Sequence, residues 1–369
     1  MFLFITDNPL GLKTYKDTSV FMMEELLAAG NEIFCCQPSD LSIKQHEFIA
    51  QAFPVVRACQ EQLLLGEPQD IFCKNATAIF MRKDPPIDAA YRNCLYMLNM
   101  MKSAGIRVIN DPQSLLCFNE KFLAFEFKQY MPPTIVTSAI DDLYVFQKKH
   151  PVTVLKPLNA MGGESIYKFD SVGNQEKEIF SQVLKNHGGL VMLQEFLPAI
   201  YDGDHRILII HGKPFPKTIA RIPKEGSFKG NLAAGGSAIG KDLTAVQEEI
   251  GNQIGRFLMQ HNIIFCGMDM IGNHLTEVNI TSPTGAREIH AFSGENPIKK
   301  LMENFPLDEN LAWGEGEDVE WSKRIRYQIE FKFNPYSQVK LLKYKPPIFS
   351  EPDKNKLKDI LEKTNQILS

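Results

Sequence analysis

The chain has 369 residues, which at about 150 residues per domain indicates two to three domains. Apolar residues make up 44% and charged residues 23%, as in soluble globular proteins, and the net charge of −4 is too small to attract nucleic acid or an anionic membrane. Seven cysteines without a Cys-x-x-Cys pair argue against disulfides and zinc, and no basic leader or long apolar segment is present, so we expect a cytoplasmic protein.

The first third of the chain alternates strands with helices, as in an α/β domain. Buried apolar runs predict strands at 2–5, 31–36, 78–81 and 107–110. Helices are expected at 20–29 and 91–102, and Asp17 and Ser19 are placed to cap the first of them.

The middle of the chain begins with a predicted helix over 119–129, which a Pro-Pro pair at 132–133 ends. Segments 152–156 and 165–169 read as two strands joined by a glycine turn that contains Gly162 and Gly163.

Further strands are predicted at 191–197 and 206–210, the second followed by a tight turn. The glycine-rich stretch from 221 to 240 is typical of a long mobile loop.

The composition changes beyond residue 305. Residues 305–320 are acidic and read as a linker, whereas 319–369 carry 11 Lys and Arg against 6 Asp and Glu. Strict alternation over 324–333, a return over 339–344 and a helix over 353–368 predict a strand hairpin followed by a helix. This part either packs on the body or a neighbouring subunit, or offers a surface for nucleic acid or an acidic partner.

The strongest local chemical signal is a predicted hairpin over 269–279 with a Gly-Asn turn. Glu277 and Asn279 share one strand face, and Asp269 lies on the partner strand, so three hard oxygen ligands meet as Mg²⁺ prefers. The alternative is a polar hairpin face.

Two lysines are candidates for binding phosphate. Lys156 precedes the Gly162-Gly163 turn, and Lys121 lies at a predicted helix start. A lysine is a point charge suited to phosphate, although each alone can equally be a solvated surface residue.

A glycine-rich match to the phosphate-binding P-loop is incomplete in this sequence. Residues 235–241 match G-x-x-x-x-G-K, but Asp242 replaces the Ser or Thr that would bind Mg²⁺, and no G-x-G-x-x-G marks a dinucleotide fold.

Four arginines are candidates for anion binding. Arg82 follows a predicted buried strand, where α/β sheets bind ligands. Arg206, Arg221 and Arg287 suit phosphate or carboxylate, and the alternative for each is a surface ion pair.

Seven motifs in chain order give the chain a resemblance to a known family. They are Met81-Arg-Lys-Asp-Pro-Pro86, Asn119-Glu-Lys121, Leu155-Lys-Pro-Leu158 with Met161-Gly-Gly163, Leu197-Pro-Ala-Ile200 with Asp202-Gly-Asp-His-Arg206, Ala220-Arg-Ile-Pro223, Gly230-Asn-Leu-Ala-Ala-Gly-Gly236, and Leu275-Thr-Glu-Val-Asn-Ile-Thr-Ser-Pro-Thr284 with Arg287-Glu-Ile289. Over residues 1–300 the chain closely resembles the prokaryotic-type glutathione synthetases of the ATP-grasp superfamily.

The resemblance implies an α/β (α+β) ATP-grasp fold. It implies a Rossmann-like substrate domain over 1–118, a central ATP-grasp lid domain over 119–198, a C-terminal ATP-grasp catalytic domain over 199–304, and an appended hairpin and helix extension over 305–369.

The activity implied is ligation of γ-glutamylcysteine and glycine with ATP, through an acyl phosphate, to glutathione, ADP and phosphate. The resemblance implies Mg²⁺, with Mn²⁺ as a substitute, and a dimeric or tetrameric homo-oligomer. The residues implied to bind ATP are Lys121, Lys156, Gly162, Gly163, Gln194, Glu195, Phe196, Leu197 and Asp204. The metal ligands implied are Asp269, Glu277 and Asn279. Arg206, Arg221 and Lys229 are implied as catalytic residues. Those implied to bind substrates are Asp17, Ser19, Arg82, Asn231, Ser282, Thr284 and Arg287.

The chain departs from the family pattern at three places. Lys229 stands where the family has arginine, Asn159-Ala160 replaces Asp-Gly, and the chain continues beyond 305. Segment 222–236 looks like the family's lid, which would protect an acyl phosphate from water.

Two alternatives stay open at this stage. One is an ATP-grasp ligase that joins another carboxylate and amine. The other is a nucleotide-binding regulatory or scaffold protein with a decayed site.

Overall fold

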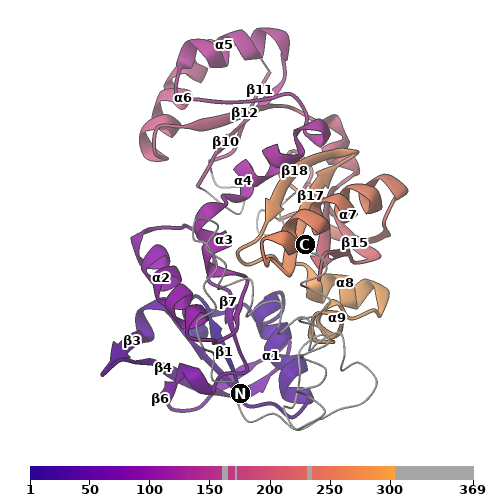
Figure 1. The fold of residues 1–369 in the computed structure, drawn as a ribbon. Helices are drawn as coiled ribbons and strands as arrows, with labels where there is room; N and C mark the ends of the chain where they lie inside the picture. The colour runs from indigo at the N-terminus through magenta and orange to yellow at the C-terminus, as the bar shows by residue number, and fades with distance from the viewer. Residues whose placement is uncertain (160–164, 171–172, 231–234, 304–369) are drawn as a thin grey trace, which may run out of the picture. The chain divides into compact units, whose positions relative to one another are not determined.

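The computed structural model describes residues 1–159, 165–170, 173–230 and 235–303. Within them the chain forms three β-sheets, each with helices packed on it (Figure 1). The hairpin and helix expected over 305–369 lie outside the described residues, as do Gly162, Gly163 and Asn231.

The N-terminal sheet has the strand order β3-β4-β2-β1-β7-β8, and β5 and β6 also pair with β4. Strands β1, β2, β7 and β8 run parallel, whereas the β4 pairs are antiparallel. The strand bounds are Phe2–Ile5 (β1), Ile33–Cys36 (β2), Leu41–Lys44 (β3), Glu47–Ala58 (β4), Leu63–Leu65 (β5), Gln69–Phe72 (β6), Ala78–Met81 (β7) and Val108–Ile109 (β8).

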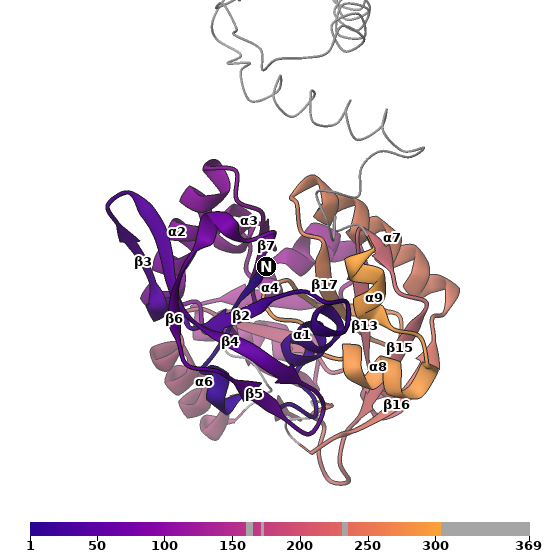
Figure 2. The ribbon, with the colours of Figure 1, turned by 90° about the horizontal axis from the view of Figure 1, so that it is seen from below.

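Helices cover both faces of this sheet. Phe2 and Phe4 of β1 pack with α1 (Thr18–Ala28), whereas Leu3 and Ile5 pack with α2 (Ala89–Ser103). Alternate side chains of a strand point to opposite faces, so a run that is buried throughout requires cover on both sides. A short helix, α3 (Pro112–Cys117), follows β8, and Figure 2 shows α1 beside the strands of this sheet.

The second sheet is antiparallel, with the order β11-β10-β12-β9. Its strands are β9 (Thr134–Thr137), β10 (Thr153–Pro157), β11 (Tyr167–Phe169) and β12 (Val191–Glu195). Leu155 and Leu193 pack with α5 (Ile140–Lys149) and α6 (Asn174–Asn186) on one face. Strand alternation therefore sends Lys156 and Gln194 to the opposite face.

The third sheet has the order β16-β15-β13-β17-β18, with β14 paired to β13. Its strands are β13 (Asp204–Ile210), β14 (Lys213–Pro214), β15 (Lys217–Ile222), β16 (Ser237–Asp242), β17 (Phe265–Ile271) and β18 (His274–Asn279). The helices that follow or interrupt it are α7 (Ala245–Gln260), α8 (Ala286–Ser293) and α9 (Pro297–Met302). Ile207, Ile209 and Met268 pack with α7, which leaves the opposite face to polar residues and to α8 and α9.

Two polar side chains, one after β8 and one at the start of the short helix α4 (Glu120–Leu123), connect these segments to the third sheet. Asn110 is 4% exposed, and its amide nitrogen donates to the carbonyls of Phe265 and Ile280. Its amide oxygen accepts from the backbone N–H groups of Ile264 and Phe265. Glu120 accepts hydrogen bonds from the backbone N–H groups of Ile280 and Thr281 at 2.8 and 2.9 Å. Both side chains satisfy backbone groups that would otherwise be buried without partners.

The structure corrects three expectations from the sequence. The helix expected over 119–129 is one α-helical turn, α4 (Glu120–Leu123), followed by a 3₁₀ segment, Ala124–Tyr130, because Phe127 has non-helical dihedral angles. The loop expected over 221–240 ends at Ser237, where β16 begins and pairs with β15. The meander of β3 to β6 was not expected, since its side chains alternate weakly between buried and exposed.

The other strand and helix expectations in the described residues are confirmed to within a few residues. Residues 237–242 form an antiparallel strand, so the G-x-x-x-x-G-K match is not a P-loop. The cysteines at all seven positions are free thiols. Among the described residues, no helix is long and apolar enough to cross a membrane. The domain boundaries stay a prediction, and each sheet falls inside one expected domain.

Candidate active site

A cavity of about 490 Å³ lies where the three sheets approach one another. Its walls come from β10 and β12, from β13, β15, β17 and β18, from α4, and from the loops after β1 and β7. Most of the candidates named from the sequence line it. They are Asp17, Arg82, Lys121, Lys156, Gln194, Glu195, Phe196, Leu197, Asp204, Arg206, Arg221, Lys229, Asp269, Glu277, Asn279, Ser282 and Thr284.

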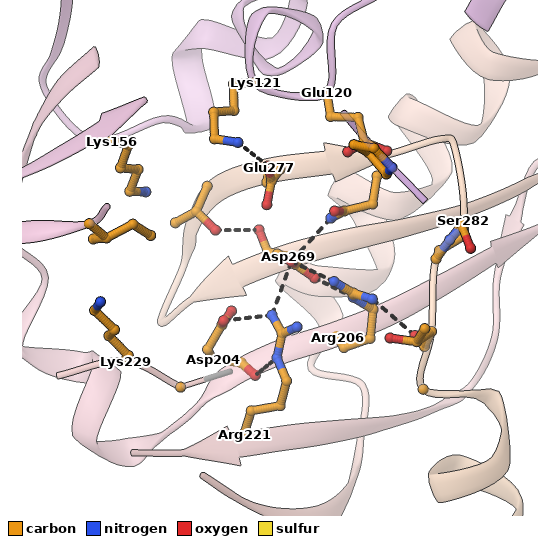
Figure 3. A pocket seen from close by; sticks show the side chains of 18 of the residues that line it. Glu120, Lys121, Lys156, Asp204, Arg206, Arg221, Lys229, Asp269, Glu277 and Ser282 are labelled. Carbon is orange, nitrogen blue, oxygen red and sulfur yellow. Dashed lines mark hydrogen bonds and ion pairs between the residues drawn. The ribbon is translucent and has the colours of Figure 1, made fainter. Parts of the chain in front are cut away.

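The charged side chains of the third sheet stand side by side because of strand register. Arg221 of β15 is opposite Asp204 of β13, and Arg206 is opposite Asp269 of β17, which in turn faces Glu277 of β18. A row of charged side chains of both signs therefore crosses four neighbouring strands, and its last two members, Asp269 and Glu277, are both acidic (Figure 3).

Asp269 is the centre of this row. Its carboxylate accepts from Nε and Nη2 of Arg206 at 2.5 and 2.8 Å, and its Oδ2 lies 3.0 Å from Nη2 of Arg221. Burial by itself would raise the pKa of Asp269, but the two guanidinium groups hold that pKa down at about 2. The carboxylate is therefore ionised at neutral pH.

Asp204 also forms an ion pair with an arginine, but its pKa is raised whereas that of Asp269 is lowered. Its Oδ2 accepts from Nη2 of Arg221 at 2.5 Å, whereas Oδ1 is buried without a hydrogen-bond partner among the described residues. Burial raises the pKa of Asp204 to about 6, an effect that Arg221 opposes only in part. The Oδ1 atom is thus open to a donor from a ligand in the cavity.

Two lysines enter the cavity from the other elements. Lys121 Nζ of α4 lies 3.1 Å from a Glu277 oxygen, and Lys156 Nζ of β10 donates to Gln194 Oε1 at 2.7 Å. Burial lowers the pKa of Lys156 because it destabilises the charged ammonium. An anion that binds in the cavity next to Lys156 would stabilise that ammonium.

The predicted metal ligands converge as the hairpin required. Asp269 and Glu277 are paired across β17 and β18, and the Asn279 amide lies 3.1 Å from Asp269 Oδ2. Among the described residues, no group of three or more His, Cys, Asp or Glu side chains gathers around a common point. The predicted magnesium ligands are therefore two carboxylates and the amide of Asn279. Such a hard set fits Mg²⁺, which completes its coordination with water and phosphate oxygens.

The N-terminal domain closes the far side of the cavity. Arg82 is 5% exposed, donates to Ser19 Oγ and to the Pro283 carbonyl, and lies over the Phe265 ring. Asp17 caps α1 by accepting from the N–H groups of Ser19 and Val20. Burial raises the pKa of Asp84, which is hydrogen-bonded to Ser282. These contacts join the loop after β7 to the loop after β18.

Two predicted substrate-binding residues do not line the cavity. Ser19 is buried inside α1 beneath Arg82. Arg287 faces α1, where its guanidinium donates to Glu24 at 2.8 Å and lies over the Phe21 ring. The structure thus places both outside the cavity lining, and Arg287 Nε is buried without a hydrogen-bond partner among the described residues, so their substrate-binding role stays a prediction.

The cavity also contains acidic residues that sequence reasoning missed. Glu120, Asp84 and Glu288 line it, and burial raises the pKa of each. Each of these acids lies in a motif that also contains a predicted site residue: Glu120 with Lys121, Asp84 with Arg82, and Glu288 with Arg287. Their positions in these motifs could have identified them from the sequence.

Comparison with known proteins gives one consistent family. The model for the prokaryotic glutathione synthetase N-terminal domain matches residues 1–115, and that for the prokaryotic glutathione synthetase ATP-grasp domain matches 120–294. Among curated relatives, the glutathione synthetase of Nitrosomonas europaea is 36% identical over 318 residues, covering 84% of this chain and 98% of that protein. The glutathione synthetase of Pseudomonas aeruginosa is 39% identical over 291 residues, covering 78% and 92%.

Solved structures share the fold at low identity. A D-cycloserine synthetase superposes with a TM-score of 0.56 at 12% identity, covering 82% of this chain and 97% of that chain. An ATP-grasp ligase complexed with a minimal precursor gives 0.54 at 15% identity, covering 81% and 97%. The expected ATP-grasp fold is confirmed.

Proposed function

Because the chain belongs to the prokaryotic glutathione synthetase family, we propose that it joins γ-glutamylcysteine to glycine at the expense of ATP, and that the cavity between its sheets is the catalytic site. The observation that carries the proposal is the row of charged side chains of both signs on the third sheet, which lines one cavity with Lys121 and Lys156. The presence of all three proposed metal ligands and both lysines in the cavity lining weighs against a scaffold protein with a decayed site.

ATP lies between the second and third sheets in this proposal. The strand end from Gln194 to Leu197 lines the cavity and offers backbone groups to adenine, and Asp204 Oδ1 accepts from a ribose hydroxyl. Lys121 and Lys156 bind the α- and β-phosphates, since both ammonium groups reach the cavity from opposite elements. Gly162 and Gly163 keep their predicted phosphate role.

Asp269, Glu277 and Asn279 would hold Mg²⁺, and Mn²⁺ is proposed as a substitute. The metal, when bound, neutralises phosphate charge and aligns the phosphate oxygens. Glu277 is then shared between the metal and Lys121, and Asp269 between the metal and the two arginines.

The first chemical step brings two anions together. The cysteinyl carboxylate of γ-glutamylcysteine attacks the γ-phosphorus, and the bond from that phosphorus to the β-bridging oxygen breaks to release ADP. Arg206 and Arg221 stabilise the equatorial charge that develops, and Lys229, in the loop after β15, adds a further cation to the cavity lining.

In the second step the glycine amine attacks the acyl carbon and phosphate leaves. We assign Ser282 and Thr284 to the glycine carboxylate and Asp17 and Arg82 to γ-glutamylcysteine, because these residues line the end of the cavity near the N-terminal domain. Asn231 and the lid over 222–236 stay part of the proposal from the sequence. A homo-oligomer and a cytoplasmic location are likewise proposed.

The test is ADP release by the purified full-length chain with ATP, Mg²⁺, γ-glutamylcysteine and glycine. We expect release only when both substrates are present, and a mass corresponding to glutathione in the product. Omitting each substrate, replacing glycine by other amino acids and replacing Mg²⁺ by Mn²⁺ separate this activity from other carboxylate and amine ligases. Absence of release with both substrates would refute the proposal.

A further inference from the structure

Two carboxylate oxygens in the described part of the chain are buried without a hydrogen-bond partner, and both belong to residues that line the cavity. They are Asp204 Oδ1 and Glu288 Oε2. Asp204 has a proposed ligand, the ribose, whereas nothing so far uses Glu288. Burying a carboxylate oxygen without a donor is costly, so a donor from a bound substrate is the natural partner.

The backbone holds Glu288 at the cavity wall. Glu288 lies in the first turn of α8, directly after the loop that carries Ser282 and Thr284. Gly285 starts this helix at a φ of +111°, and a Cβ at that position would come within 3.0 Å of Arg206 Cγ. Only a glycine therefore allows α8 to begin so close to the charged row.

The surroundings of Glu288 favour a proton acceptor. Burial raises the pKa of Glu288 from its usual value, while Arg206, Arg287 and Lys16 oppose the rise. A carboxylate with a raised pKa is a stronger base than a solvated one, yet the nearby cations keep its ionised form accessible.

We infer that Glu288 binds the ammonium group of glycine through its unpartnered oxygen and takes the proton that must leave before the amine can react. This inference rests on the proposed function and names the group that activates the second substrate. Phosphates and substrate carboxylates would be repelled by Glu288, so a cationic amine is the ligand whose charge fits it. Its place beside Ser282 and Thr284 points to glycine rather than to the amino group of γ-glutamylcysteine.

Two protons leave the glycine nitrogen in this step, and one bond at the acyl carbon is exchanged for another. The glycine ammonium gives one proton to the Glu288 carboxylate, which frees the nitrogen lone pair. The nitrogen forms a bond to the acyl carbon, and the bond from that carbon to the phosphate oxygen breaks with its electron pair on the oxygen. The second nitrogen proton goes to the departing phosphate.

The experiment compares two nucleophiles in the full-length chain and in Glu288→Gln. Hydroxylamine is uncharged at neutral pH and traps an acyl phosphate as a hydroxamate without needing a base. We expect Glu288→Gln to lower glycine-dependent turnover about 100-fold or more, as loss of a general base does, while hydroxamate formation stays within about twofold. Glu288→Asp should recover part of the glycine-dependent rate, and raising the pH should do the same for Glu288→Gln by supplying deprotonated glycine.

Glu295→Gln is the matched control, because Glu295 lies just beyond the same helix, is partly exposed and does not line the cavity. It should leave both reactions unchanged. The inference is overturned if Glu288→Gln slows both reactions equally, if it slows neither, or if it raises the KM for γ-glutamylcysteine and not that for glycine. Failure of the unsubstituted chain to form any hydroxamate would overturn the proposed function itself, and the inference with it.

Discussion

Arg206 and Asp269 lie directly opposite each other on β13 and β17, and two hydrogen bonds of 2.5 and 2.8 Å join the guanidinium to both carboxylate oxygens. The pair is buried, so its geometry is specified by the sheet and not by solvent. A third arginine bond from Arg206 Nη1 to the Thr284 carbonyl connects the pair to the loop after β18. The same carboxylate is therefore both a structural partner and a proposed metal ligand.

Asp269→Asn should destabilise the fold as well as remove activity. The substitution leaves Arg206 and Arg221 without their shared counter-charge in a buried place, which typically costs about 3 to 5 kcal/mol. Urea unfolding measures this loss. The control is Asp242→Asn, which removes an exposed ion pair with Lys217 and should change stability far less. Equal losses in the two variants would contradict the prediction.

Glu277→Gln should keep the fold and greatly weaken Mg²⁺-dependent turnover. The amide preserves the shape of the side chain but loses the charge that faces Lys121 and that a divalent cation requires. A Mg²⁺ titration of ADP release, together with calorimetric binding of Mg²⁺ in the presence of ADP, checks this. Unchanged turnover and unchanged Mg²⁺ affinity would mean that the hairpin is only structural.

Asp204 should make stability increase as the pH falls from neutrality. Burial raises its pKa to about 6 in the fold, above the ordinary value of an aspartate in the unfolded chain, so the folded state binds a proton more readily than the unfolded state. This contribution is fully present below the unfolded value and is lost as the pH rises through about 6. Urea unfolding at about pH 7 and pH 5 should show a rise that Asp204→Asn lacks. The same rise in Asp204→Asn would assign it to other groups, such as Glu120 or Asp84.

Asn110→Ala should destabilise the chain by about 3 kcal/mol, because it leaves backbone groups of the third sheet buried without partners. Thermal or urea unfolding measures the effect. Asn186→Ala, at an exposed helix end, is the control and should change stability only slightly. A loss of similar size in both variants would argue against a bridging role for Asn110.

Deleting residues 319–369 should leave ligase chemistry in place, since those of the described residues that line the cavity all precede 289. ADP release by the truncated chain, with circular dichroism to establish that it is folded, tests this. A folded but completely inactive truncated chain would make the tail part of the catalytic unit. If activity is retained, the tail either packs on the rest of the protein or binds an acidic partner. A partner-capture experiment would distinguish these two roles.

Local patterns predicted the elements that depend on near neighbours. Asp269 and Glu277 are eight positions apart and joined by a two-residue turn, so their meeting followed from hairpin geometry. Lys156 and Gln194 are far apart in the chain, and their contact depends on the pairing of β10 with β12, which no local pattern specifies.

The sequence by itself determined the class of protein, the motif residues and most strands, because residue chemistry and period-two patterns are local. Only the tertiary structure decided which charged groups share the cavity. Arg287 and Glu288 are adjacent in the chain, yet α8 turns the first toward Glu24 and the second into the cavity. Successive residues of a helix point about 100° apart. Because α8 packs against α1, Arg287 is directed toward α1 and Glu288 into the cavity.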